Sequence, residues 1–230
     1  MATDVRRAAR PASAGVEPEV AEQFEDLEQQ HETYELGMWL FLATEVLFFG
    51  GLFAGYSAYR IVFHAGFLEG SRHTDVTLGT INTAVLLTSS LTMALAVHSA
   101  RAGKRKLLAG LLTVTLLLGA AFMVIKGVEY YGEYREGLVP WLGFRFPGPL
   151  AGGVDLFFVF YFFMTGLHAI HLTIGIVIVG VIAALARKGR FLREDSTTVE
   201  MVGLYWHFID IVWVFLYPLL YLLSRNGGAP

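Results

Sequence analysis

The stretch Tyr205-Trp-His-Phe-Ile-Asp-Ile-Val-Trp-Val-Phe-Leu-Tyr217 decides the fold class. It is apolar enough to enter a bilayer, yet it contains His207 and Asp210, which lie three residues apart and therefore share one face of a helix. An aspartate at the middle of a membrane costs about 2.5–3.5 kcal/mol on insertion scales, so its side chain must face protein, water or a polar partner. The stretch predicts a membrane helix that packs on other helices through a polar face.

The composition indicates a membrane protein. Of the 230 residues, 55% are hydrophobic and 16% are charged, with a mean hydropathy of +0.54, whereas soluble domains average about 25% charged residues. No basic patch is interleaved with polar surface, which argues against nucleic acid as a partner. Because the chain has no cysteine, it cannot itself hold a disulfide, an iron–sulfur cluster, a thiolate copper site or a covalently attached c-type haem.

Five apolar stretches are long enough to span a bilayer, which takes about 20 residues. They cover residues 36–59, 76–99, 107–130, 154–186 and 199–224. The fourth is longer than a hydrocarbon core of ~30 Å requires, so it must tilt, kink or project beyond the membrane. We therefore expect an all-α, polytopic membrane helix bundle, with residues 36–225 forming one domain of five transmembrane helices.

The segment before this domain has a different character. Residues 1–16 are small and basic and contain a proline, which favours disorder. Residues 17–35 are acidic and rich in helix formers, and Pro18 suits a first helical turn. We expect a short surface helix there, which is either a docking arm for a partner or a solvated leader.

The distribution of positive charge predicts the orientation. The connections after the second and fourth stretches hold eight Lys and Arg residues, whereas the opposite side holds five over more residues. Because positive charge favours the cytoplasmic face, the N-terminus is predicted to be cytoplasmic and the C-terminus periplasmic. On the outer side, residues 132–153 are expected to form an ordered loop with Trp141 and Phe144 near the lipid headgroups, and Lys126 is placed to extend toward the same interface.

Glu45 is the first ionisable residue within an apolar stretch. It lies roughly 13 Å along the predicted helix from its inner end. Two functional interpretations are open, a proton-handling site or a partner for a buried histidine. The structural alternative is a hydrogen-bonded carboxylate that seals a contact between helices.

His168 and His171 belong to the fourth stretch and are spaced to share a helix face. Such pairs can bind a metal ion or haem iron. A metal site needs further ligands, and neither an HExxH motif nor a local carboxylate cluster accompanies them. We expect these histidines to form hydrogen bonds with Glu45, with another helix or with a lipid headgroup. Glu45 and His171 are the specific pair predicted to meet across the first and fourth helices.

Glu129, His207 and Asp210 complete the set of candidate site residues. Glu129 falls near the outer end of the third stretch, where it is either a buried group or an interfacial carboxylate that touches water. His207 and Asp210 are predicted to form a second polar cluster that holds the bundle together. Glu129 is a possible member of that cluster, but its depth argues against it because His207 lies in the inner half of the fifth stretch.

Together, these residues resemble subunit III of the haem–copper oxidases, the cytochrome c oxidase family. Five motifs match in order and cover about residues 37–221. They are Gly37-Met-Trp-Leu-Phe-Leu-Ala-Thr-Glu-Val-Leu-Phe-Phe49, Asn82-Thr-Ala-Val-Leu-Leu87, Glu129-Tyr-Tyr131, Thr165-Gly-Leu-His-Ala-Ile-His171 and Tyr205-Trp-His-Phe-Ile-Asp-Ile-Val-Trp213. Many members have seven spans. The chain resembles the shorter five-helix form, which lacks the first two.

The resemblance implies an accessory role in an aerobic terminal oxidase of a bacterial inner membrane. In this family, subunit III holds no haem or copper; those groups belong to partner subunits. The implied partners are the catalytic subunit I, subunit II, bound phospholipid and, in some cases, a larger respiratory supercomplex. The Glu45-Val46 pair and the Tyr205-Trp-His-Phe208 sequence look closer to cytochrome c oxidase members than to quinol oxidase members.

Three other functions are compatible with the sequence. The first is an accessory subunit of nitric oxide reductase with the same fold. The second is a small secondary transporter with intramembrane carboxylates, which would be active in liposomes as a single chain. The third is a b-type haem protein that uses His168 or His171, which would show a haem absorbance band when purified alone.

Overall fold

The computed structural model describes residues 27–191 and 196–226. Its helices are α1 (Leu27–Val62), α2 (His64–Arg72), α3 (Val76–Arg101), α4 (Arg105–Arg135), α5 (Ala151–Arg187), α6 (Thr197–Tyr221) and α7 (Leu223–Asn226). Within the described residues there is no strand. Five of these helices, α1, α3, α4, α5 and α6, are long and apolar enough to cross a membrane, which confirms the five predicted stretches.

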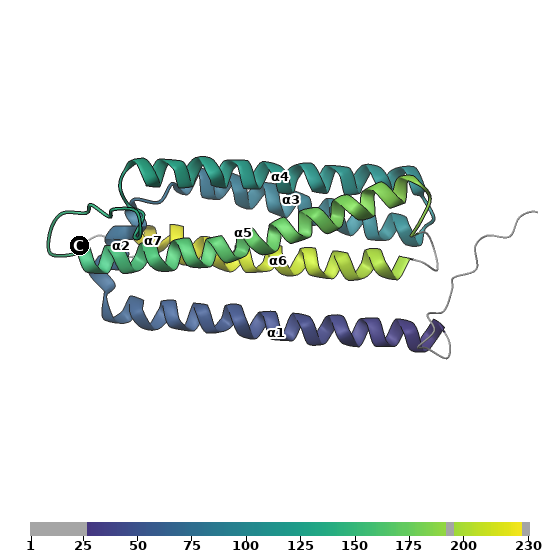
Figure 1. Cartoon of the computed structure of the whole chain (residues 1–230), viewed down its shortest axis with the longest axis horizontal. Coiled ribbons are helices and arrows are strands. Elements are labelled where there is room, and N and C mark those ends of the chain that lie inside the picture. Colours follow the sequence, from purple (N-terminus) through teal and green to yellow (C-terminus); the bar gives the residue numbers. More distant parts are fainter. Residues whose placement is uncertain (1–26, 192–195, 227–230) are drawn as a thin grey trace, which may run out of the picture.

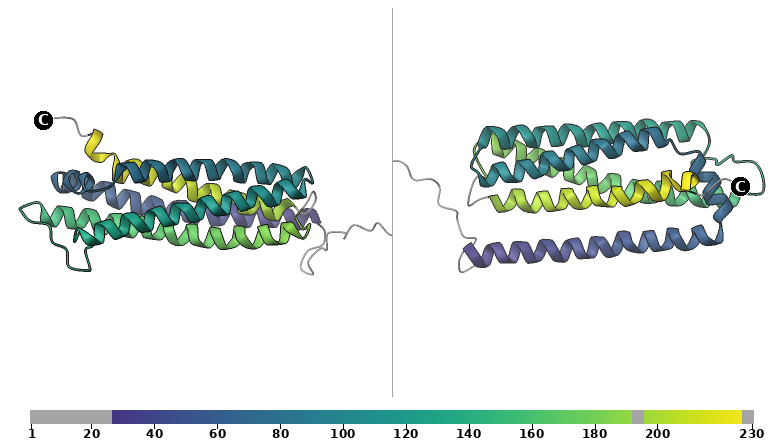
Figure 2. Two further views of the ribbon diagram at one scale, coloured as in Figure 1. Left: turned by 90° about the horizontal axis from the view of Figure 1, so that it is seen from above. Right: turned by 180° about the vertical axis from the view of Figure 1, so that it is seen from behind.

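The five long helices lie side by side along the length of the molecule (Figures 1 and 2). One end of the bundle carries the start of α1, the turn between α3 and α4, and the connection between α5 and α6 (Figure 1). The other end carries α2, α7 and the loop between α4 and α5 (Figure 1). The described chain therefore begins and ends at opposite ends of the bundle, as an odd number of spans requires.

Helix α6 is the central helix and α1 the peripheral one. More than half of the most apolar window of α6 is buried (56%), against 11% for α1. The indole rings of Trp206 and Trp213 on α6 are fully buried. Trp206 fits because α4 and α5 present Gly119 and Gly175 to it, and a Cβ atom at either glycine would lie within 3.3 Å of its ring. The two glycines thus leave room for the Trp206 ring of α6 against α4 and α5 at the centre of the bundle.

The ends of the helices differ from the sequence prediction in two places. Residues 27–35, predicted as part of a separate surface helix, form the continuous beginning of α1 instead; the rest of that prediction lies outside the described residues. Helix α2 was not predicted, because its sequence HAGFLEGSR contains two glycines and is not strongly apolar. It forms because Gly66, Phe67 and Gly70 are buried, with the two glycines lying directly against α5.

The long fourth stretch is one unbroken helix. Helix α5 has 37 residues, which corresponds to a length of about 55 Å. It accommodates this length by running obliquely across its neighbours (Figure 1). The loop that precedes it, residues 136–150, is shorter than predicted because α4 continues to Arg135. In that loop Trp141 points outward with 66% of its surface exposed, whereas Phe144 packs on the core instead of facing outward.

The close contact between α2 and α5 at Gly66 generates a stability prediction. A Cβ atom on Gly66 of α2 would lie 2.5 Å from the Cα atom of Gly153 on α5, which is backbone and has no room to move. Gly66→Ala should therefore lower the free energy of unfolding by about 1–3 kcal/mol through overpacking. Thermal unfolding of the purified protein in detergent measures this loss. Gly127→Ala is the matched control, because nothing lies within 4 Å of that position; equal losses in both variants would contradict the prediction.

Candidate functional site: buried polar groups between the helices

Glu45 on α1 and His171 on α5 contact each other, as predicted from the sequence. The distance between His171 Nε2 and Glu45 Oε2 is 3.1 Å. Both side chains are about four-fifths buried, and the ring of Phe49 lies edge-on against the imidazole at 5.3 Å. This pair joins the peripheral helix α1 to α5, and the Tyr56 hydroxyl of α1 donates a second hydrogen bond to the carbonyl oxygen of Leu219 on α6 at 2.7 Å.

The hydrogen bond of the second ring nitrogen of His171 determines how many protons the Glu45–His171 pair must hold. His171 Nδ1 lies 2.8 Å from the carbonyl oxygen of Leu167, and a carbonyl can only accept a hydrogen bond, so Nδ1 carries a proton. The bond between Nε2 and Glu45 then requires one more proton, on either the imidazole or the carboxyl group. Both arrangements are neutral as a pair, which suits a largely buried position in a membrane.

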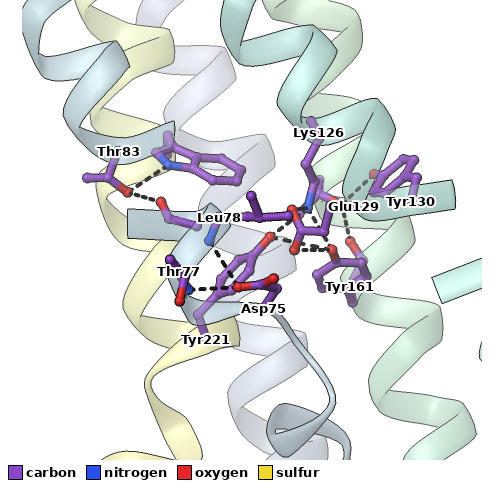
Figure 3. A network of polar contacts seen from close by, with 12 residues as sticks. Asp75, Thr77, Leu78, Thr83, Lys126, Glu129, Tyr130, Tyr161 and Tyr221 are labelled. Carbon is purple, nitrogen blue, oxygen red and sulfur yellow. Dashed lines mark hydrogen bonds and ion pairs between the residues drawn. The ribbon is translucent and has the colours of Figure 1, made fainter. Parts of the chain in front are cut away.

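The most extensive polar cluster is centred on Lys126 of α4. Its ammonium group donates to Glu129 Oε2 at 3.0 Å, to the Tyr161 hydroxyl at 2.7 Å and to the Tyr221 hydroxyl at 2.6 Å. Tyr161 in turn donates to Glu129 Oε1 at 2.9 Å. Figure 3 shows these side chains converging from α4, α5 and α6. The three N–H donors of the ammonium group are therefore matched by three acceptors from three helices.

Aromatic rings surround the Lys126 ammonium group as well. The centroids of four rings lie between 4.4 and 5.7 Å from Nζ, and they belong to Tyr130, Tyr161, Trp213 and Tyr221. Lys126 itself is only 2% exposed. The prediction that Lys126 extends toward the outer interface is therefore wrong: it turns inward because carboxylate, hydroxyl and ring partners are all available inside.

Two carboxyl groups accompany this single ammonium group. Glu129 is 5% exposed, so of the two interpretations the buried one is correct. Glu133, one turn further along α4, is equally buried, and neither of its carboxyl oxygens has a hydrogen-bond partner among residues 27–191 and 196–226. Glu133 was missed in the sequence, although Lys126, Glu129 and Glu133 are spaced i, i+3 and i+7, a pattern that places all three on one helix face.

His168 behaves differently from His171. It is 1% exposed, and neither ring nitrogen has a hydrogen-bond partner within the described part of the chain. Its ring packs against Trp213 at 5.2 Å and Phe122 at 5.7 Å. The prediction that His168 forms a hydrogen bond is therefore wrong. The two histidines share a spacing but contact different neighbours, so they do not converge on a common ligand.

His207 and Asp210, predicted as a second polar cluster, do not bond to each other directly, and Ser90 of α3 lies beside both side chains. His207 Nδ1 bonds to the hydroxyl of Ser90 on α3 at 2.7 Å, so it does join two helices. Asp210 is 4% exposed, and both of its carboxyl oxygens lack a hydrogen-bond partner in the described chain. Glu129 belongs to the Lys126 cluster and not to this one, in agreement with the argument from depth. No group of three or more His, Asp or Glu side chains in residues 27–191 and 196–226 is arranged to hold a metal ion.

A family model described as "Cytochrome c oxidase subunit III" matches residues 23–225. The chain belongs to the cytochrome c oxidase subunit III family. Membership confirms the resemblance drawn from the five motifs. Together with the five apolar helices, it places the protein in a membrane.

Curated relatives come from oxidases with different electron donors. The chain is 33% identical to quinol oxidase subunit 3 of Bacillus spizizenii, over 87% of this chain and 94% of the relative. It is 32% identical to cytochrome c oxidase subunit 3 of Thermostichus vulcanus, over 83% and 87%. It is 30% identical to cytochrome bo(3) ubiquinol oxidase subunit 3 of Pseudomonas putida, over 82% and 85%. Similarity at this level supports subunit III of a terminal oxidase without selecting the donor.

In this subunit III chain, removing the Lys126 ammonium group should be strongly destabilising. Lys126→Met leaves Glu129 and Glu133 buried without a cation, which is expected to cost about 3–5 kcal/mol of unfolding free energy. Lys126→Met/Glu129→Gln should recover part of that loss, because one of the two uncompensated carboxylates is gone. Thermal unfolding in detergent provides the comparison. Val124→Met is the control on the lipid-facing side of α4, and a loss no larger than that of the control would exclude the ion pair as a stabilising contact.

The Glu45–His171 contact predicts an order of stability among three residues at position 45. Glu45→Gln keeps an N–H donor for His171 Nε2 and should stay close to the parent protein. Glu45→Leu leaves the imidazole unpaired and should lose about 1–3 kcal/mol of unfolding free energy. In a His171→Leu background, the advantage of Gln over Leu should disappear. If the two substitutions at position 45 ranked the same way in both backgrounds, the side chains would not be coupled.

Proposed function

We propose that this chain is the non-catalytic subunit III of a haem–copper terminal oxidase in a bacterial inner membrane. The complex reduces oxygen to water and translocates protons, and its haem and copper lie in partner subunits. The single observation that carries this proposal is the family match over residues 23–225. Catalytic subunit I and subunit II are the proposed partners, within a larger respiratory supercomplex in some cases.

The described geometry supports a stabilising role for the chain within that complex. Glu45 bonds to His171 across α1 and α5, and Lys126 of α4 bonds to the hydroxyl groups of Tyr161 on α5 and Tyr221 on α6. Such contacts fix the arrangement of α1, α4, α5 and α6. A rigid bundle of this kind suits a subunit that supports the catalytic subunit and its proton uptake during turnover.

A lipid-binding role is part of the same proposal. A groove of about 420 Å³ lies between α1 and α6, at the side of the bundle where α1 makes few contacts. Aromatic and aliphatic side chains form most of its walls, among them Trp39, Phe49, Phe53 and Phe215. An elongated apolar groove at membrane depth suits the acyl chain of a bound phospholipid.

We propose cytochrome c as the electron donor of the complex. The support is the Glu45-Val46 pair and the Tyr205-Trp-His-Phe208 sequence, which look closer to cytochrome c oxidase members. The chain also has relatives among quinol oxidases, so oxygen uptake with each donor is the measurement that separates the two classes.

Copurification provides the test of the proposed function. A tagged chain isolated in a gentle detergent should bring down haem-containing partner subunits and oxygen-consuming activity with reduced cytochrome c. Selective removal of this chain should leave the haem spectrum intact and make the remaining enzyme lose activity sooner during turnover. A colourless chain without partners would contradict the proposal, and transport by that chain alone in liposomes would support a secondary transporter. Nitric oxide reduction without oxygen reduction would identify the other accessory class.

A further inference from the structure

A basic hollow lies at the end of the bundle where α4 begins and α5 ends. Its volume is about 700 Å³, and three cationic side chains together with three small residues line it: Arg105, Lys106, Ala109, Gly110, Thr113 and Arg187. All of its charged lining residues are therefore positive. This end is the one predicted to be cytoplasmic from the distribution of Lys and Arg.

The two guanidinium groups are held in place by contacts between the helices. Arg105 donates a hydrogen bond to the carbonyl oxygen of Arg187, and Arg187 Nη2 donates to Thr113 Oγ1 at 3.1 Å. Among residues 27–191 and 196–226, no carboxylate forms an ion pair with either arginine or with Lys106. Arg101, at the same end of the bundle, is instead paired with Glu200 at 2.6 Å. Within the described part of the chain, positive charge is thus concentrated at the hollow without a carboxylate in ion-pair contact.

The start of α4 adds to this positive potential. The residue before the helix, Lys104, provides no side-chain cap, and the first turn contains no acidic residue. Arg105 N–H donates to the carbonyl oxygen of Gly103, and the positive end of the helix macrodipole lies at the same end of α4 as Arg105 and Lys106. An anionic group bound there would interact with side-chain and backbone donors together.

The hollow extends from the charged helix ends into the apolar part of the bundle. Thr113 lies eight residues after Arg105, which is about 12 Å along α4. Between them, Gly110 leaves open space, since a Cβ atom there would meet nothing within 4 Å. A free phosphate ion would use only the charged rim, whereas a molecule with an anionic head and an apolar tail would use the whole length.

We propose that this hollow binds an anionic phospholipid. The phosphate-bearing headgroup contacts Arg105, Lys106 and Arg187, and the adjoining part of an acyl chain runs past Ala109 and Gly110. Basic pockets between transmembrane helices near the cytoplasmic surface recognise such headgroups by charge. The proposal does not depend on the electron donor or on the oxidase function, because it rests only on the ends of α4 and α5.

The test uses the full-length chain in the complex with which it copurifies. Phosphatidylglycerol with a photoactivatable group near its headgroup is titrated onto the complex, and labelled peptides are quantified. Labelling should saturate on the peptides that contain residues 105–113 and 187, and phosphatidylcholine with the same acyl chains should label them weakly. Lys106→Gln should raise the half-saturating phosphatidylglycerol concentration roughly fivefold, the effect expected for one basic residue at a membrane surface. Gly110→Leu should raise it as well, by filling the hollow without changing charge.

Lys188→Gln is the matched control, because it removes one exposed cation next to Arg187 that does not line the hollow. Its half-saturation should match that of the parent complex, and all variants should share one melting temperature. Equal effects of Lys106→Gln and Lys188→Gln would overturn the site, as would equal labelling by phosphatidylcholine. Displacement by excess inorganic phosphate would identify a site for the free ion instead, and crosslinks from residues 105–113 to a protein subunit would identify a protein contact.

Discussion

The Lys126 ammonium group imposes the strongest constraint on this structure. It sits inside a bundle whose outer surface is apolar, so water is not available to replace a missing partner. Its bonds to Glu129, Tyr161 and Tyr221 come from three different helices. Helices α4, α5 and α6 must therefore hold one relative position and rotation, since a shift of any of them would leave a buried charge without its acceptor.

Aromatic packing on α6 also fixes the position and rotation of this helix relative to its neighbours, through apolar contacts. Trp206 enters the space left by Gly119 and Gly175, and Trp213 packs edge-on against Phe122, tilted against His168, and beside the Lys126 cluster. Both indole N–H groups are also satisfied, by hydroxyl groups of Ser89 and Thr83 on α3. Helix α6 thus combines large rings with polar tips, which fixes its depth and its rotation together. Helix α1, by contrast, is attached mainly through Glu45, the Tyr56 hydroxyl and a few rings, and it leaves a groove beside α6.

These features connect the fold to the role proposed for this subunit III chain. The polar side chains that join its helices, such as Glu45 with His171 and Lys126 with its tyrosine partners, bond to one another and do not converge on a common ligand. Two of its hollows lie on the outside of the bundle, one between α1 and α6 and one at the end where α4 begins and α5 ends. In the proposed role, such a chain contributes shape, rigidity and lipid contacts to the complex, and the redox groups belong to its partners.

The sequence by itself determined the five spans, because apolar stretches of sufficient length leave few alternatives in a membrane. It also determined the family, through ordered motifs, and the Glu45–His171 contact, since each side chain is costly to bury unpaired. Only the tertiary structure decided the partners of the remaining polar groups. Helical spacing states which face a residue occupies but not which neighbour covers that face, so His168 packs against rings although it shares a spacing with His171. For the same reason the sequence did not reveal that Lys126 bonds to groups inside the bundle. It also did not reveal α2, whose two glycines allow close packing only because α5 lies against them.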